Sequence, residues 1–260
     1  MSSSVADAPD AAVPDIDLRE LTADLFHALN QPLTGLRCFL ELAGLSQERP
    51  SALRLETAVA MAERAGRIAQ YLRELVDAEY GGDHLELLNL TDYLREACTD
   101  FQPVAQAARV GFRFDPSDAS SWVRFEAARL REALFHLLEF AFSQTTPGGN
   151  VVIAALSRRG TATLQLQISP GDLSPAALLE RHDIEKKEKE DKEDELRQRW
   201  RLALCHRRFE AAGGGLVVTS QIGTLTITAH LPQAEPDAEG QGTSSSSFRE
   251  ASFSRFHQSR

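Results

Sequence analysis

The sequence predicts an α+β protein, in which a helical hairpin is followed by an α/β sandwich. Two long segments before Gly81 carry apolar residues at helical spacing, and a short loop joins them. Beyond Gly82, short segments with alternating apolar residues are separated by helical ones, as in a mixed sheet covered by helices. A chain of 260 residues is long enough for both parts, because domains average roughly 100–200 residues.

Composition and charge exclude several classes of function. A net charge of −10 argues against a general nucleic-acid binder, which is usually basic. No apolar run approaches the roughly 20 residues of a membrane helix, and we find no signal-peptide core, so we expect a cytoplasmic protein without a membrane span. Cys38, Cys98 and Cys205 lack metal-ligand spacing, and we expect buried free thiols rather than a metal site.

The first helix is predicted to begin at Asp17, which is suited to cap it, with Glu20 three residues later. Residues 1–16 before it have little to bury and should be disordered. The helix should run to about Gly44, where a turn begins. Its apolar stripe consists of Leu18, Leu21, Leu25, Leu29, Leu33, Leu36 and Leu40.

A second helix is predicted from Ser51 to about Tyr80, with an apolar face of its own. The hairpin at residues 17–80 cannot bury both stripes by itself. Pairing with a second copy removes this problem, so we expect a homodimer held by a four-helix bundle.

The elements after the hairpin are predicted from short apolar patterns and their turn residues. Helices are expected at residues 91–108, 127–143 and 196–212, and strands at residues 84–90, 110–114, 121–125, 151–157, 161–169, 216–220 and 224–231. Helices on one face of a mixed sheet make an α/β sandwich.

Two segments near the C-terminus have biased compositions. Residues 180–198 are rich in Glu, Asp and Lys at i,i+4 spacing, which favours an exposed helix stabilised by its own ion pairs; a docking arm for a partner is the alternative. Residues 233–260 are rich in Pro, Gly and Ser and should be disordered. Phe248, Phe253 and Phe256 in this tail are candidates for a short linear binding motif.

The first helix carries the motif HALNQPL at positions 27–33, with His27 beside the leucine stripe. By themselves these residues also fit an exposed histidine on an ordinary coiled-coil helix. The motif resembles the H-box of two-component histidine kinases, which implies that His27 is the phosphoacceptor and that Asn30 and Gln31 assist it as catalytic residues. The acidic residue that follows the histidine in the family is Ala28 here, so general-base assistance is missing.

The resemblance covers about residues 17–232. The helix ending in TTPGG, the hairpin after it, and the segment ALCHRRFEAAGGGLVVTSQIGTLTITAHLP are similar to the ATP-binding domain of these kinases. That domain has the GHKL fold of gyrase, Hsp90 and MutL ATPases. The resemblance implies a dimerisation and phosphotransfer hairpin at residues 17–80 and a degenerate GHKL-like domain at residues 83–232, with residues 180–198 in place of the ATP lid.

Two nucleotide-binding motifs of the family are altered in this chain. His136 and Phe140 stand where the kinases have two asparagines, and a phenylalanine offers Mg²⁺ no oxygen ligand. Ser169 and Gly171 fall in the first glycine box, which lacks the aspartate that binds adenine in the family.

The second glycine box is altered as well. Arg199 and Arg201 flank a tryptophan where the family's glycines bring the backbone close to the phosphates. Bulky side chains there would obstruct a phosphate site. We therefore expect no nucleotide cofactor, no metal, and no ATP-dependent kinase activity.

Three functions are compatible with this pattern. The first is a histidine phosphotransferase, similar to ChpT-like proteins, that exchanges phosphate between His27 and receiver-domain aspartates, with the receiver supplying the magnesium. The second is a pseudokinase that binds a kinase or response regulator and never carries phosphate, which Ala28 favours. The third is an active kinase with a divergent ATP site. Response-regulator receivers are the expected partners, and a hybrid histidine kinase is a further candidate.

Overall fold

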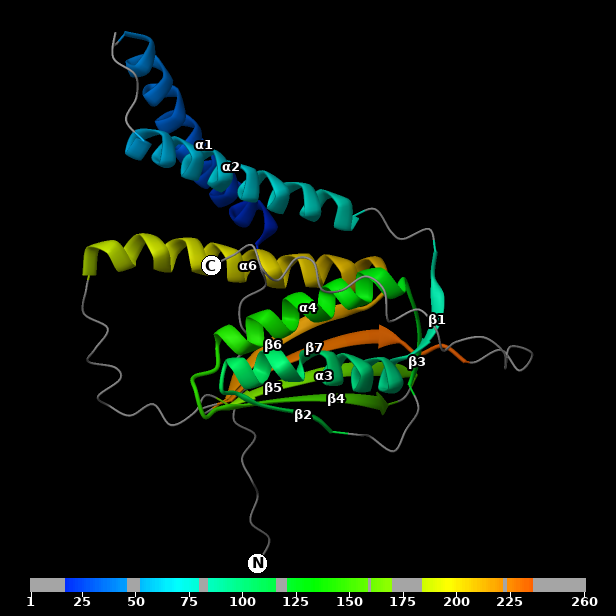
Figure 1. Cartoon of the computed structure of the whole chain (residues 1–260). Coiled ribbons are helices and arrows are strands. Elements are labelled where there is room, and N and C mark those ends of the chain that lie inside the picture. Colours follow the sequence, from blue (N-terminus) through cyan, green and yellow to red (C-terminus); the bar gives the residue numbers. More distant parts are fainter. Residues whose placement is uncertain are drawn as a thin grey trace, which may run out of the picture.

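The computed structural model describes residues 17–45, 52–79, 84–115, 121–158, 160–169, 184–221 and 224–235. A helical hairpin lies over a unit made of helices and a sheet (Figure 1). The hairpin consists of α1 (Leu18–Leu45) and α2 (Ala52–Glu79), which pack against each other. The predicted α+β class is confirmed.

Helix α1 begins where the sequence predicts. The carboxylate of Asp17 accepts hydrogen bonds from the backbone N–H groups of Arg19, at 2.9 Å, and Glu20, at 3.4 Å. These bonds satisfy amides that have no partner within the helix. The helix continues through Pro32, whose ring is buried, and ends one residue beyond Gly44.

The sandwich is built on the strands that follow the hairpin. Their bounds are β1 Glu86–Asn89, β2 Gly111–Asp115, β3 Trp122–Phe125, β4 Asn150–Arg158, β5 Thr161–Ser169, β6 Gly215–Gln221 and β7 Thr224–Pro232. The main sheet has the order β2-β4-β5-β7-β6, in which β2 is parallel to β4 and the other neighbours are antiparallel. A separate antiparallel pair joins β1 and β3. Every predicted strand occurs, and the described bounds differ from the predicted ones by at most two residues.

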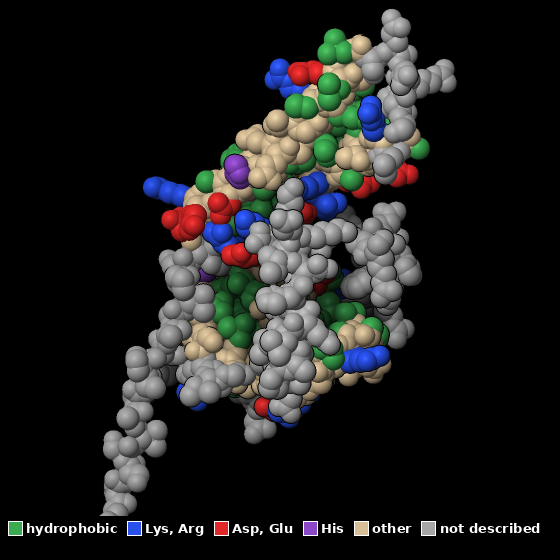
Figure 2. Space-filling model, turned by 90° about the vertical axis from the view of Figure 1, so that its left-hand side faces the viewer, with side chains coloured by type: hydrophobic (Ala, Val, Ile, Leu, Met, Phe, Trp, Pro, Cys, Tyr) green, Lys and Arg blue, Asp and Glu red, His purple; other side chains and the backbone are tan. Residues whose placement is uncertain are grey.

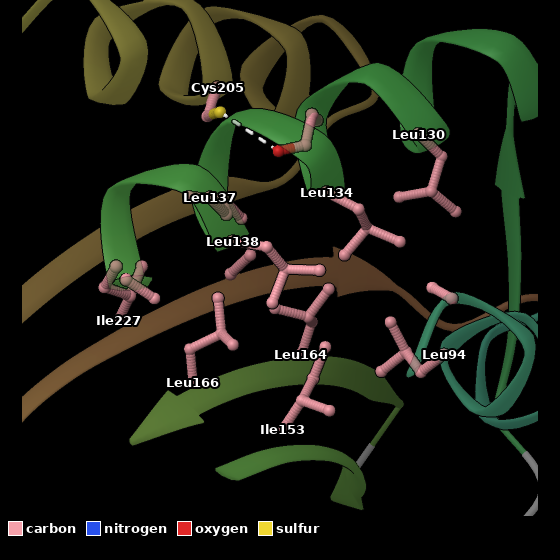
Figure 3. Close-up of a cluster of buried hydrophobic side chains, with 14 of the residues drawn as sticks. Leu94, Leu130, Leu134, Leu137, Leu138, Ile153, Leu164, Leu166, Cys205 and Ile227 are labelled. Carbon is pink, nitrogen blue, oxygen red and sulfur yellow. Dashed lines mark hydrogen bonds between the residues drawn. The ribbon is translucent and has the colours of Figure 1, made fainter. Parts of the chain in front are cut away.

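Helices α3 (Leu90–Ala107), α4 (Ala127–Ser143) and α6 (Ile184–Ala211) cover one face of the main sheet (Figure 1). Leucines of α4 point down onto the strands and form the centre of the core (Figure 3). Among them, Leu134, Leu137 and Leu138 lie above Ile153 and Leu164, and all five are almost fully buried. Removal of this apolar surface from water is the main force that holds α4 on the sheet.

Helix α6 differs from the prediction. The sequence indicated a charged insert at residues 180–198 and a separate helix from residue 196, whereas one continuous helix runs from Ile184 to Ala211. The insert does form a helix from residue 184 onward, as its ion-pair spacing indicated, and Arg197 pairs with Asp194 at 3.7 Å. It is not exposed throughout, because Leu196 and Gln198 pack inward.

The last strand is followed by a short bonded segment. The backbone N–H groups of Gln233 and Ala234 donate to the carbonyl groups of Gly160 and Trp122, at 2.9 and 2.8 Å, two residues beyond the predicted end of the sandwich at residue 232. The predictions for residues 1–16, for residues 180–183 and for the phenylalanines of the tail lie outside the described residues.

Candidate functional site

His27 lies on the exposed side of α1. Successive residues of a helix are about 100° apart, so His27 points about 200° away from Leu25, which is fully buried. Its Nε2 atom lies 3.2 Å from the side-chain nitrogen of Gln31, one turn further along. Asn30 is also exposed, so all three predicted catalytic residues lie on the accessible surface of the same two turns.

The neighbour of His27 has the opposite environment. Ala28 is half-buried and packs against an apolar cluster shared by α1, α2 and α6, together with Leu29. The buried members of this cluster are Leu21, Leu25, Ile68, Leu75, Ala78, Trp200, Ala203 and Leu204. The residue that replaces the family's carboxylate therefore faces an apolar contact between helices.

Arg199, which stands in the second glycine box, reaches α1. Its guanidinium donates a hydrogen bond to the carboxylate of Asp24 at 2.7 Å and lies 3.7 Å from Glu20. Asp24 precedes His27 by three residues, about one helical turn. The arginine thus connects α6 to the start of the H-box.

Trp200 also connects α6 to the hairpin. Its ring stacks on Tyr71 of α2, with centroids 4.1 Å apart and planes inclined by 25°. Its indole N–H donates to the backbone carbonyl of Tyr71 at 3.1 Å. His136 packs edge-on against the same indole at 5.1 Å. Trp200 is 4% exposed, so its ring fills the junction of three helices.

The remaining nucleotide-binding positions do not fit ATP with magnesium. Phe140 is 7% exposed and presents only carbon, so it cannot bind a cation. Arg201 is paired with Glu139 at 2.6 Å, and Arg199 is paired with α1 as described above, so both guanidinium groups are already engaged by carboxylates. Ser169 ends β5, and Gly171 lies outside the described residues.

A hollow of about 370 Å³ lies between α4 and α6 at these positions. It is lined by Phe140, Gln144, Asp194, Glu195, Gln198, Arg199 and Leu202. The carboxylates of Asp194 and Glu195 would repel a triphosphate, because like charges at close range are unfavourable. The charge of these two side chains argues against a phosphate cradle here.

His136 is buried beside two arginines. Burial, followed by the positive charges of Arg208 and Arg201, lowers the pKa of its imidazole from 6.5 to about 3. Oxygen atoms of Glu74 and Glu132 lie within 4.8 Å of a ring nitrogen of His136 and of one another, as metal ligands would. However, Arg208 pairs with Glu132 at 2.7 Å, and the positive field that suppresses protonation of His136 also opposes a metal cation. We therefore assign no metal site to this cluster.

The sequence identified the altered positions but not their partners. It indicated that Arg199, Trp200 and Arg201 would obstruct a nucleotide, and it gave no sign that Asp24 and Glu139 would bind the two arginines. The arginines and these carboxylates are separated by 175 and 62 positions. Pairs so distant in sequence become visible only when the helices are placed.

Comparison with known proteins places this geometry in context. No protein-family model matches the chain. The sensor protein DivL of Caulobacter vibrioides is 25% identical over 224 residues, which are 84% of this chain and 28% of DivL. The sensor protein SphS of Synechococcus elongatus is 27% identical over 142 residues, which are 53% of this chain and 34% of SphS. The chain thus spans about a third or less of the length of these two curated relatives.

The fold is similar to those of solved histidine kinase structures. The histidine kinase AdeS of Acinetobacter baumannii superposes with a TM-score of 0.53 at 16% identity, covering 80% of this chain and 98% of that one. The histidine kinase ThkA, in complex with the response regulator protein TrrA, gives 0.53 at 15% identity, covering 84% of this chain and 62% of that one. This chain has the fold of a histidine kinase core. The predicted helical hairpin and GHKL-type α/β sandwich of such a core are confirmed.

Within the described parts of the chain, no helix combines the length and the hydropathy that crossing a bilayer requires.

Proposed function

We propose that this histidine-kinase-like protein is a histidine phosphotransferase of a two-component phosphorelay. It exchanges phosphate between His27 and receiver-domain aspartates and has no ATP-dependent kinase activity of its own. The observation that carries the proposal is the contrast between an exposed His27 in a largely intact H-box and nucleotide-binding positions that are filled by Phe140 and by paired arginines.

The chemistry at His27 requires an accessible lone pair on the imidazole. When the amide of Gln31 donates its hydrogen bond to Nε2, the ring proton is on Nδ1, and the Nε2 lone pair becomes free for attack once this contact opens. The lone pair attacks the phosphorus of the aspartyl phosphate, the bond from phosphorus to the aspartate oxygen breaks, and the carboxylate leaves with its electrons. The Nδ1 proton can then pass to solvent, because His27 is exposed.

The hairpin supplies the surfaces for a receiver and for a second copy of the chain. Hydrophobic side chains lie on the surface of the hairpin (Figure 2). Phe26, beside His27, is 53% exposed, and Leu33 and Leu40, one heptad apart, are 45% and 60% exposed. Exposed apolar side chains in such a row are typical of an interface. Receivers as partners are supported by ThkA, whose structure contains the response regulator protein TrrA.

A pseudokinase that only binds its partners is the second candidate. Ala28 favours it, because a missing general base typically lowers the rate by about 10²–10⁴-fold. Ala28 also packs against the apolar cluster, so this position serves the contact between helices. We prefer the phosphotransferase, because a scaffold needs neither the exposed imidazole nor its contact with Gln31.

One experiment separates the three functions. The protein is incubated with a set of phosphorylated receivers from the same cell, and separately with radiolabelled ATP. A phosphotransferase removes phosphate from one receiver, a pseudokinase binds a receiver that keeps its phosphate, and a kinase is labelled by ATP alone. His84→Asn, at an exposed histidine outside the H-box, should behave like the wild type.

A further inference from the structure

We propose that helix α6 is a fixed brace for the phosphoacceptor helix and that Arg199 and Trp200 are positioning residues for His27. These residues stand where the second glycine box of the resembled kinases binds phosphate, so the segment has exchanged nucleotide contact for contact with the hairpin. The effect on phosphate transfer rests on the proposed function, whereas the fixed arrangement of the two units does not.

The brace has an apolar centre made by three helices. Leu21 and Leu25 of α1, Ile68 of α2, and Trp200 and Leu204 of α6 are each at most 4% exposed and belong to one cluster. The N-terminal half of the α1 stripe is therefore covered by α6 and α2 within one chain. Separation of α6 from the hairpin would expose this whole cluster to water.

Ion pairs hold α6 along about half of the length of α2. Near the start of the contact, Arg64 and Arg67 of α2 lie 3.2 and 3.6 Å from Glu193. At the other end, Arg207 lies 3.3 Å from Glu79. From residue 64 to residue 79 a helix rises about 22 Å. Contacts over this length resist rotation of one helix on the other, which a single contact does not.

The same helix is anchored to the sandwich on its other side. Arg208 pairs with Glu132 at 2.7 Å, and the thiol of Cys205 donates to the carbonyl of Ala133 at 3.4 Å (Figure 3). Phe209 is fully buried in the main core. Because α6 is fixed on both sides, the hairpin and the sandwich form one rigid arrangement.

The H-box turn depends directly on this arrangement. Asp24, one turn before His27, is held by Arg199, and Ala28 and Leu29 pack against the cluster that contains Trp200. The positions before and after His27 are thus both backed by α6. A shift of α6 would move the imidazole relative to a bound receiver, and misplacement by about 1 Å can cost about 10²-fold in rate.

The test is a charge swap between α6 and α1. Arg199→Asp places a carboxylate beside Asp24 and Glu20, and Asp24→Arg in the same chain restores an opposite-charge pair. Lys192→Asp, an equal charge change at an exposed position of α6, is the matched control. Spin labels on Cys38, exposed on α1, and on Gln167→Cys, exposed on β5, report the distance between the two units in a Cys98→Ala background.

We expect a narrow distance distribution between the two labels in the protein with Arg199 and Asp24 intact and in Lys192→Asp. Arg199→Asp should give a broad or shifted distribution, and the charge swap should restore the narrow one. Transfer from a phosphorylated receiver should fall about tenfold or more in Arg199→Asp at saturating receiver and recover in the swap, with unchanged receiver affinity. A distribution that is broad before substitution, or that Arg199→Asp leaves unchanged, overturns the brace. If no variant accepts phosphate, the proposed function fails while the distances still decide the brace.

Discussion

At the scale of single residues, neighbours in the H-box have different tasks. His27 is exposed beside Gln31, whereas Ala28 is half-buried against the contact with α6. A carboxylate at position 28 would lose part of its hydration in that contact, which is costly for a charged group without a partner. The sequence showed that the family's acidic residue is missing, and the helix contact supplies the physical reason why alanine suits the position.

His136 should make the protein less stable in acid. Its folded pKa of about 3 lies below the ordinary value of 6.5, because of burial and of the charges of Arg208 and Arg201. Between these two values the unfolded chain binds a proton that the folded chain does not, so the free energy of unfolding falls as the pH falls. The slope from this group approaches about 1.4 kcal/mol per pH unit.

Urea unfolding of the wild type and of His136→Gln between pH 7 and 4 measures this effect. The free energy of unfolding of the wild type minus that of His136→Gln should decrease as the pH falls. His84→Asn, at an exposed histidine, should track the wild type. A difference that stays constant with pH would show that folding does not lower the pKa of His136.

At the scale of elements, α6 determines how the hairpin and the sandwich fit together. Its first half was read from the sequence as an exposed charged insert, because alternating charges hide the few apolar residues that dock. Leu196 and Trp200, one turn apart, are the visible signal of a docking face in this stretch. The contact with Tyr71 could not be predicted, since it depends on the position of a helix 129 residues away.

Trp200 should be the main stabilising side chain of this contact. Trp200→Ala removes a nearly buried indole and should lower the free energy of unfolding by about 3–5 kcal/mol. Trp200→Phe keeps a stacking ring but loses the hydrogen bond to the Tyr71 carbonyl and some ring volume. The lost hydrogen bond should lower the free energy of unfolding by about 1 kcal/mol. Chemical denaturation measures both values, and equal costs for the two substitutions would contradict the geometry described above.

The elements were predicted more completely than the contacts between them. Periodicity placed the hairpin, α3, α4 and every strand, because each has a clear apolar pattern bounded by turn residues. The same rules placed His27 outside the buried stripe and identified Phe140 as unsuitable for magnesium. They could not reveal that half of the α1 stripe is covered by α6, since the pattern shows that a face is apolar and not what covers it.

At the scale of the whole molecule, the uncovered half of the α1 stripe predicts a dimer. Leu33 and Leu40 are exposed although they continue the line of Leu21 and Leu25. Leu40→Glu should convert the protein to a monomer, because a charge in an apolar helix bundle must be desolvated. Light scattering measures the mass. Cys38→Glu, about 200° round the helix at another exposed position, should remain a dimer, and a wild-type monomer of normal stability would refute the prediction.

The filled nucleotide site predicts that ATP with magnesium does not stabilise the protein. A ligand at 100 times its dissociation constant adds about 2.7 kcal/mol to the free energy of unfolding, which a melting scan detects. We expect no shift in melting temperature at millimolar ATP with magnesium. A clear magnesium-dependent rise would mean that the hollow between α4 and α6 accepts nucleotide, and it would revive the kinase.

The central claim, that His27 carries phosphate received from a response regulator, is tested most directly by locating the phosphate. The protein is mixed with its phosphorylated receiver, and the acid-labile phosphate is mapped by mass spectrometry under neutral conditions. Our account predicts phosphohistidine at His27 in the wild type and in His84→Asn, and none anywhere in His27→Ala. A receiver that binds the wild-type protein and keeps its phosphate, or phosphate found on another histidine, would contradict it.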